Sequence, residues 1–210
     1  MTDKPEYKPP RQNNYDIAHK MAVEKLKAMD FEGQCEKAGV KVTDTGAEIE
    51  FVDRKYLVNK ESLEFTPADN GPAPELWEEI VILHYMIAAD GSGPTGELIS
   101  YKQVPDGAPY IAVFNKRTSG ILLSVFGDRL PALLETAKKL GAEQVEDHGD
   151  MAFKIQALPK VEYIFVLYEA DPEFPAEIKV LFDSSIQNYL PAEDITVLCQ
   201  MLCIKIVKSQ

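Results

Sequence analysis

Long hydrophobic runs are missing from this sequence. No stretch of its 210 residues approaches the roughly 18 consecutive apolar residues that a membrane-spanning helix requires. The N-terminal segment MTDKPEYKPPRQNN is polar, and no apolar core of a signal peptide follows its charges. We therefore expect a cytoplasmic protein without a membrane partner.

Positive charge is also scarce. Lys and Arg number 22 against 34 Asp and Glu, so the formal net charge is −12. The acidic excess falls after residue 60, and no cluster of Lys and Arg interrupts it. Such a surface repels nucleic acid and anionic lipid. We therefore expect no nucleic-acid partner.

Cysteine is rare, with three residues and no framework spacing, which favours a reducing compartment. Cys199 and Cys203 are one helical turn apart and could supply two thiolates to a metal site. A closed zinc or iron–sulfur site needs about four ligands, and only Cys35 and three scattered histidines remain. We predict that the cysteines pack in the core, label slowly with thiol reagents and bind no metal.

The sequence contains no G-x-S-x-G elbow, no P-loop and no H-E-x-x-H motif. Gly91, Gly93 and Gly96 do spell G-x-G-x-x-G. A dinucleotide site needs a strand before this motif and a helix after it, whereas here a helix is expected before it and a strand after it. The three glycines therefore indicate a helix stop and a turn.

The N-terminal third predicts a helix, a β-meander and a second helix. Residues 1–13 hold three prolines and are predicted to form a flexible arm. A helix follows from Asn13 or Asn14 to about residue 30, ended by Gly33, with His19 facing water. Its apolar stripe would consist of Ile17, Met21, Ala22, Leu26 and Met29.

A short antiparallel meander is expected over residues 40–65, where β-type runs are separated by tight turns. Pro74 then opens a helix through Ala89. Its predicted stripe contains Trp77, Ile80, Val81, His84, Ile87 and Ala88. On that stripe His84 is either a satisfied core residue or a general base or metal ligand.

The remaining chain predicts short helices over 107–140, strands over 151–183 and a closing helix that opens at Pro191. The run VEYIFVLYEA is apolar on both faces, which indicates an interior strand. Its link to EIKVLFD is too short for a parallel crossover, so we predict an antiparallel pair. Because helices and strands are grouped rather than alternating, we expect an α+β fold, with residues 14–210 as a single domain.

The stretch EADPEFPAE concentrates Glu169, Asp171, Glu173 and Glu177 between two apolar runs. Proline disfavours helix at the residue before it, so the loop should be stiff and extended. Carboxylates on one side repel each other unless a cation, an Arg or a shared proton lies among them. The loop is therefore either a solvated turn or a site. For a site, we expect Phe174 to be buried as a plug and Arg117 or a nearby lysine to compensate a carboxylate.

Several segments resemble an uncharacterised domain-of-unknown-function family of mainly anaerobic bacteria and archaea. The matching segments are GELISYKQVPDGAPYIAVFNKR, SVFGDR, GDMAFKIQALPKV and YEADPEFPAEIKVLFDSS. Some relatives resemble fusions to a small cysteine-rich iron–sulfur module, which this chain lacks. The resemblance implies a setting in anaerobic metabolism and carries no established activity.

We therefore expect an accessory module that binds a small ligand, a cofactor or a protein partner near the acidic loop. The alternatives are an enzyme that uses paired carboxylates, with or without a divalent metal, and a purely structural interaction protein. The sequence identifies no catalytic residue, cofactor or oligomeric state. The candidate ligand-binding residues are Glu97, Tyr101, Tyr110, Arg117, Glu169, Asp171, Glu173 and Asp183.

Overall fold

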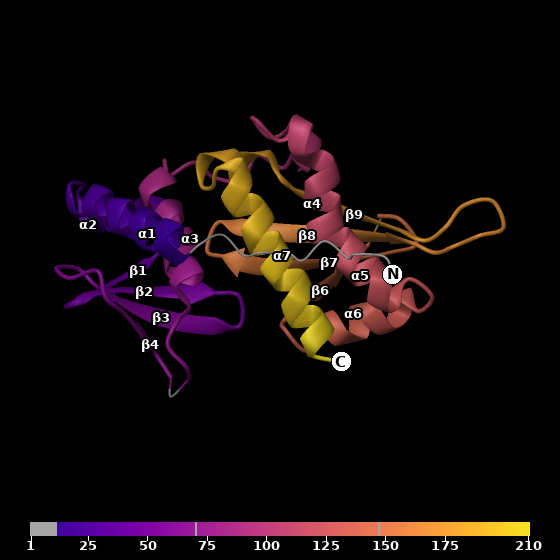
Figure 1. The fold of residues 1–210 in the computed structure, drawn as a ribbon, viewed down its shortest axis with the longest axis horizontal. Coiled ribbons are helices and arrows are strands. Elements are labelled where there is room, and N and C mark those ends of the chain that lie inside the picture. The colour runs from indigo at the N-terminus through magenta and orange to yellow at the C-terminus, as the bar shows by residue number, and fades with distance from the viewer. Residues whose placement is uncertain (1–11, 70, 147) are drawn as a thin grey trace, which may run out of the picture.

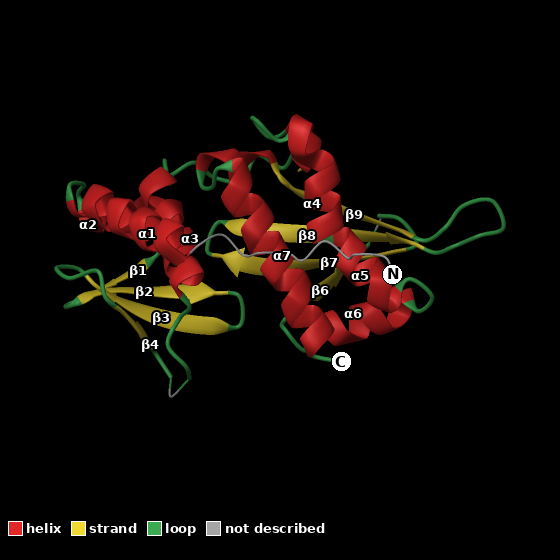
Figure 2. Ribbon diagram, in the orientation of Figure 1, coloured by secondary structure: helices red, strands yellow, loops and turns green. Residues whose placement is uncertain are grey.

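The protein is an α+β structure with two antiparallel sheets and a long C-terminal helix (Figures 1 and 2). A computed structural model describes residues 12–69, 71–146 and 148–210. The predicted fold class is confirmed. The arm predicted for residues 1–13 lies almost wholly outside the described residues.

The elements follow one another in two groups, each with its own sheet. The first group is α1 (Gln12–Lys27), α2 (Phe31–Ala38), β1 (Lys41–Thr43), β2 (Gly46–Phe51), β3 (Arg54–Asn59), β4 (Phe65–Pro67) and α3 (Leu76–Ala88). The second is β5 (Leu98–Ser100), α4 (Ile111–Arg117), α5 (Ser119–Phe126), α6 (Leu130–Lys138), β6 (Glu143–Val145), β7 (Met151–Leu158), β8 (Val161–Tyr168), β9 (Glu177–Asp183) and α7 (Ala192–Lys208). None of the described helices is both long enough and apolar enough to cross a bilayer.

Strand β8 lies in the middle of the five-stranded sheet, whose order is β5-β9-β8-β7-β6. It pairs antiparallel with β7 on one side and with β9 on the other. The predicted interior strand and its antiparallel pairing are confirmed. Alternate residues of β8 face the helices, and Tyr163, Phe165 and Leu167 on this face are buried. Helices α4 to α7 lie over this face (Figure 2).

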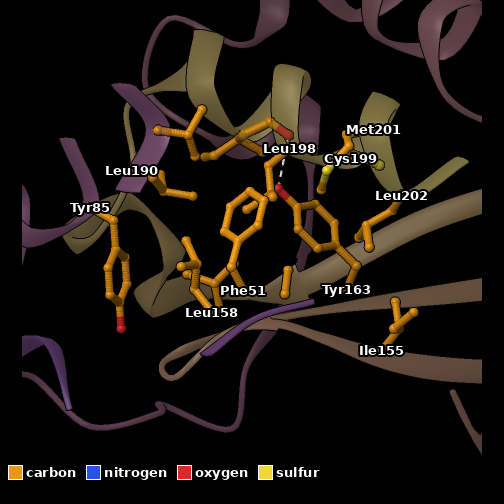
Figure 3. Packing of buried hydrophobic residues seen from close by; sticks show 14 of the residues in the cluster. Phe51, Tyr85, Ile155, Leu158, Tyr163, Leu190, Leu198, Cys199, Met201 and Leu202 are labelled. Atoms are coloured by element: carbon orange, nitrogen blue, oxygen red, sulfur yellow. Dashed lines mark hydrogen bonds between the residues drawn. The ribbon is translucent and has the colours of Figure 1, made fainter. Parts of the chain in front are cut away.

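The four-stranded sheet β1-β2-β3-β4 is the predicted meander. It shares one hydrophobic core with the larger sheet, because Phe51 at the end of β2 belongs to the same buried cluster as Tyr163 and Leu198 (Figure 3). The backbone N–H of Val52 donates to the carbonyl of Ala157 at 2.9 Å. The meander turn is thereby joined directly to β7.

The N-terminal helices differ from the prediction. Helix α1 ends at Lys27, and Asp30 is extended as the N-cap of α2. Gly33 lies inside α2, whose C-cap is Gly39 in the left-handed conformation with φ 67°. The predicted stripe of α1 is partly wrong, since Ile17 is 59% and Met21 65% exposed while Ala22 and Leu26 are buried. The helix packs on α3 through a face rotated away from Ile17 and Met21.

His19 lies on this rotated face, so the expectation that it faces water is wrong. Its Nε2 is 2.8 Å from Oε2 of Glu79 on α3. Burial raises the pKa of Glu79, while the neighbouring His19 acts in the opposite sense. The pair joins α1 to α3.

Helix α3 begins at Leu76 rather than at Pro74, because Glu75 is its N-cap and forms a capping box with Glu78. The helix is buried on more than one stripe, since α1, α2 and α7 all contact it. Ile82, Leu83, Tyr85 and Met86 are completely buried. Ala88, which the stripe would have buried, is exposed.

Candidate ligand-binding cleft

The acidic loop between β8 and β9 is a self-contained turn. Oδ1 of Asp171 accepts the backbone N–H groups of Glu173 and Phe174 at 2.8 and 2.7 Å. The N–H of Asp171 donates to the carbonyl of Phe174 at 2.9 Å. The carboxylate of Asp171 thus organises its own loop.

The predicted role of Phe174 as a buried plug is wrong, because its side chain is 66% exposed. The hairpin projects beyond the helices that cover the sheet (Figure 1, the loop joining β8 to β9). An exposed Phe174 therefore does not orient Asp171 and Glu173 toward a ligand.

Arg117 does not approach this loop. Its Nε donates to Oε1 of Gln200 at 2.8 Å, and its Nη1 is 3.5 Å from Oε1 of Glu193. The lysine alternative is confirmed at one carboxylate, since Nζ of Lys179 is 3.6 Å from Oε2 of Glu177.

The other candidate residues are scattered. Tyr101 is buried, stacks on Phe114 at 4.2 Å between ring centroids and donates to the carbonyl of Ala192. Tyr110 is 59% exposed, and Glu97 is an exposed residue of the turn before β5. The eight residues therefore do not form one site.

Asp183 lies at the end of β9 and fastens the glycine-containing turn before β5. Its Oδ1 accepts from the backbone N–H groups of Thr95 and Ser185, and its Oδ2 accepts from the N–H of Gly96. Burial works against ionisation of Asp183, but the hydrogen bonds from Ser185, Thr95 and Gly96 outweigh it, so the pKa lies well below its usual range. Asp183 borders a groove of about 370 Å³, yet both carboxylate oxygens are occupied.

His84 has a partner that the sequence did not indicate. Its Nδ1 is 2.6 Å from Oδ2 of Asp194 in the first turn of α7. Asp194 is 6% exposed, and the N-terminus of α7 stabilises its negative charge. A histidine oriented by a carboxylate supplies two of the three members of a catalytic triad. The third member, a nucleophile, would hydrogen-bond to Nε2 of His84, and no described residue does so. We therefore interpret the His84–Asp194 pair as a structural contact between α3 and α7.

A cleft of about 560 Å³ opens between the start of α3 and helix α7. We call it the α3–α7 cleft. Its α3 wall consists of the segment Pro72–Ala73, the first turn of α3 with Glu75, Trp77 and Glu78, and Arg54 from the meander. Tyr15 of α1 lies at its edge. Trp77 is the single tryptophan of the chain.

Polar contacts hold the α3 wall in place. Oε2 of Glu78 accepts the N–H of Glu75 at 2.8 Å and the hydroxyl of Tyr56 at 3.3 Å. Arg54 donates to the Tyr56 hydroxyl at 2.6 Å and to the carbonyl of Pro72 at 2.8 Å. Burial and then the charge of Glu78 raise the pKa of Tyr56, so its hydroxyl stays protonated and can donate.

The opposite wall is one face of α7, together with Arg117 at the end of α4. Residues on this face recur at helical spacing: Val197, Met201 and Ile204 form an apolar strip, Gln200 lies beside it, and Lys205 and Lys208 follow toward the C-terminal end of α7. In total the cleft is lined by four basic and two acidic side chains, although the chain carries a net charge of −12.

The cysteines lie away from the cleft, in the core. Cys35, Cys199 and Cys203 are buried, and burial raises the pKa of the Cys35 thiol to about 11. Burial also raises the pKa of Cys199, with a contribution from Cys203. Within residues 12–69, 71–146 and 148–210, no three His, Cys, Asp or Glu side chains are grouped so as to hold a metal ion.

The family described as "Domain of unknown function (DUF3786)" matches residues 30–205. The chain belongs to the DUF3786 family. The match takes in both sheets and nearly all of both cleft walls, with Tyr15 and Lys208 just outside it. Neither the curated proteins nor the solved structures gave a match.

Sequence reasoning about this DUF3786 chain identified one residue of the cleft, Arg117. Trp77 was assigned to a buried stripe, and Lys205 and Lys208 occupy the side of α7 that an amphipathic pattern marks as solvent. A signal was available, because a lone tryptophan at a helix start is a natural binding-site candidate. The cleft itself depends on how α7 approaches the meander, which no local pattern encodes.

Proposed function

We propose that this protein is a binding module whose small-molecule ligand occupies the α3–α7 cleft. The observation that carries the proposal is the lining of the cleft, which combines Trp77 with an apolar strip of α7 and four basic side chains. Pockets for small ligands combine apolar and aromatic walls with a few fixed polar groups, within a volume of roughly 300–1,000 Å³. The α3–α7 cleft, at about 560 Å³, has these properties.

A binding module is favoured over an enzyme that uses paired carboxylates. Such an enzyme should bring Asp171, Glu173 or Asp183 together with Arg117 or His84 at the wall of one pocket. Arg117 lines the α3–α7 cleft without any of these carboxylates. Asp171 and Glu173 are exposed in the hairpin loop.

A purely structural interaction protein has less support. Its mark would be a contiguous exposed apolar patch. The large exposed apolar side chains are instead spread over several elements: Tyr15, Ile17 and Met21 on α1, Val42 and Leu57 on the meander, Tyr110 and Val113 at α4, and Phe174 in the hairpin loop. We extend the proposal to an accessory role in anaerobic metabolism, which the resemblance implies, and to a cytoplasmic setting, since the odd number of cysteines favours a reducing compartment.

Thermal unfolding in the presence of a chemically varied panel of small molecules tests the proposal. We expect at least one compound to raise the unfolding temperature and to change the fluorescence of Trp77 in a saturable way. Val197→Phe fills the cleft and should abolish both effects, whereas Val42→Phe, at an exposed position of β1, should leave them intact.

A panel in which no compound stabilises the protein would contradict the proposal. So would a compound that stabilises the Val197→Phe variant as much as the native protein, because that compound binds elsewhere.

A further inference from the structure

The Trp77 ring in the α3–α7 cleft is hydrogen-bonded to the N-cap residue of α3. Its Nε1 donates to Oε2 of Glu75 at 2.7 Å, so the indole is held at the start of α3 while its side chain remains partly exposed. On the opposite wall Val197, Met201 and Ile204 form the apolar strip of α7. Trp77 and this strip line the same cleft, and an aromatic ring together with aliphatic and thioether side chains favours a flat apolar ligand.

Two of the three charged side chains on the α3 wall, Glu78 and Arg54, are satisfied within the protein, while the third, Glu75, is exposed and accepts from Nε1 of Trp77. Glu78 is 3% exposed, and its carboxylate is engaged by Tyr56, by the N–H of Glu75 and by Arg54 at 3.6 Å. The guanidinium of Arg54 is in turn engaged by Tyr56, Glu78 and the carbonyl of Pro72. Neither residue therefore has much capacity left for a ligand.

The charges on the α7 wall are less fully used. Arg117 is fixed through its Nε by Gln200, and its one carboxylate partner among the described residues is Glu193 at 3.5 Å, whose side chain is 74% exposed. Its remaining N–H groups are therefore pre-oriented and only weakly neutralised. Lys205 pairs with Asp53 at 2.5 Å, while Lys208 has no ion pair within the described part of the chain.

Gln200 adds a neutral donor beside this arginine. Its Oε1 accepts from Nε of Arg117, and no residue in the described part of the chain hydrogen-bonds to its Nε2 amide, which can donate. A guanidinium and an amide side by side match the oxygens of a carboxylate or a phosphate.

We propose that the ligand of the α3–α7 cleft is a small planar aromatic ring that carries one anionic group, either carboxylate or phosphate. The inference rests on the proposed binding function and names the chemistry of its ligand. The ring stacks on Trp77 against the apolar strip, and the anion binds Arg117 and Gln200. Lys208 adds long-range attraction to an anion in a protein that otherwise repels anions.

Calorimetric titration with two matched sets of probes tests this ligand class. The first set is adenosine 5′-monophosphate, adenosine and ribose 5-phosphate; the second is benzoate, benzamide and acetate. We expect at least one planar anion to bind ten-fold or more tightly than both its neutral and its ring-free counterparts. The set that shows this preference distinguishes a phosphate from a carboxylate ligand.

Substitutions then locate the anion. Arg117→Gln should lower the affinity for the preferred planar anion ten-fold or more. Arg117→Lys should recover part of this affinity, because lysine restores the charge without the bidentate geometry of arginine. Arg129→Gln is the matched control, since Arg129 is exposed at the start of α6 and contacts Val125 and Gln210 instead. It should change the affinity less than two-fold.

Equal binding of a neutral counterpart, or equal losses in the Arg117→Gln and Arg129→Gln variants, would overturn the ligand class. If neutral compounds bind in the cleft while neither planar anion does, the ligand class is wrong and the binding function stands. If binding persists in the cleft-filled Val197→Phe variant, both are wrong.

Discussion

Phe174 and Phe182 lie eight positions apart in the sequence and differ completely in their surroundings. Phe182 on β9 is fully buried, and its ring meets that of Tyr163 edge to face at 6.0 Å. Phe174 is 66% exposed. We expect Phe182→Ala to cost about 3–5 kcal/mol of unfolding free energy. Phe174→Ala should change it by less than about 0.5 kcal/mol.

Urea unfolding of the two variants measures the difference. A loss above about 1.5 kcal/mol for Phe174→Ala, the lower bound for fully burying a phenylalanine, would show that the loop packs on the core after all.

At Asp183 a single carboxylate fastens the turn before β5, and its contribution depends on pH. The folded-state pKa lies below the unfolded value of about 3.9, so the ionised group stabilises the protein at neutral pH. This contribution is lost as the pH falls below about 4 toward the folded-state pKa. We expect Asp183→Asn to lower the free energy of unfolding by about 1–2 kcal/mol at pH 7 and by clearly less at pH 3.

Chemical unfolding at the two pH values checks this, with Glu97→Gln as the control for a nearby exposed carboxylate. An equal loss at pH 7 and pH 3 would mean that the charge of Asp183 is not what holds the turn.

At the scale of elements, the His84–Asp194 contact is a partly buried polar link between α3 and α7. A double-mutant cycle with His84→Ala and Asp194→Ala should give a coupling energy of about 1–2 kcal/mol, because the pair is short and Asp194 is buried. The Arg117–Glu193 pair links α4 to α7 and is the natural comparison. Its coupling should stay below about 0.5 kcal/mol, since Glu193 is largely exposed. Equal coupling energies for the His84–Asp194 and Arg117–Glu193 pairs would contradict a specific stabilising role of the His84–Asp194 contact.

Most elements could be predicted from the sequence because their signals are local. The two-sided apolar run of β8 and its short link to β9 decided both strand position and pairing. Helix α1 shows the limit, since His19 rather than Ile17 faces α3 and the correct phase depends on a partner 60 residues away. The short strand β6 was not predicted, because its exposed residues carry no apolar alternation.

The candidate site was harder to predict than the fold. The concentration of acid at Asp171 and Glu173 is a strong compositional signal, yet Asp171 is occupied by its own loop. Trp77 and Lys205 are far apart in the sequence and meet only because α7 packs against the meander end of the molecule. The apolar periodicity of a helix predicts which of its faces is buried, but it does not predict which other helix or sheet packs against that face.

At the scale of the whole molecule, the two sheets share one buried cluster, which includes Phe51 from the meander and Phe165 from β8. We therefore propose that residues 14–210 unfold as one domain. Trp77 fluorescence reports the cleft and far-ultraviolet circular dichroism reports both sheets, so their denaturation curves should coincide. Two separated transitions would show that the meander and the larger sheet are independent units.

The central claim is that the ligand site is the α3–α7 cleft and not the acidic hairpin loop. Hydrogen exchange of the protein with and without a saturating planar anion, adenosine 5′-monophosphate or benzoate, tests it most directly, because bound segments exchange more slowly. We predict slower exchange in residues 72–78 and 197–208, and unchanged exchange in residues 169–177. Protection confined to residues 169–177, or no protection in either cleft wall, would contradict the account.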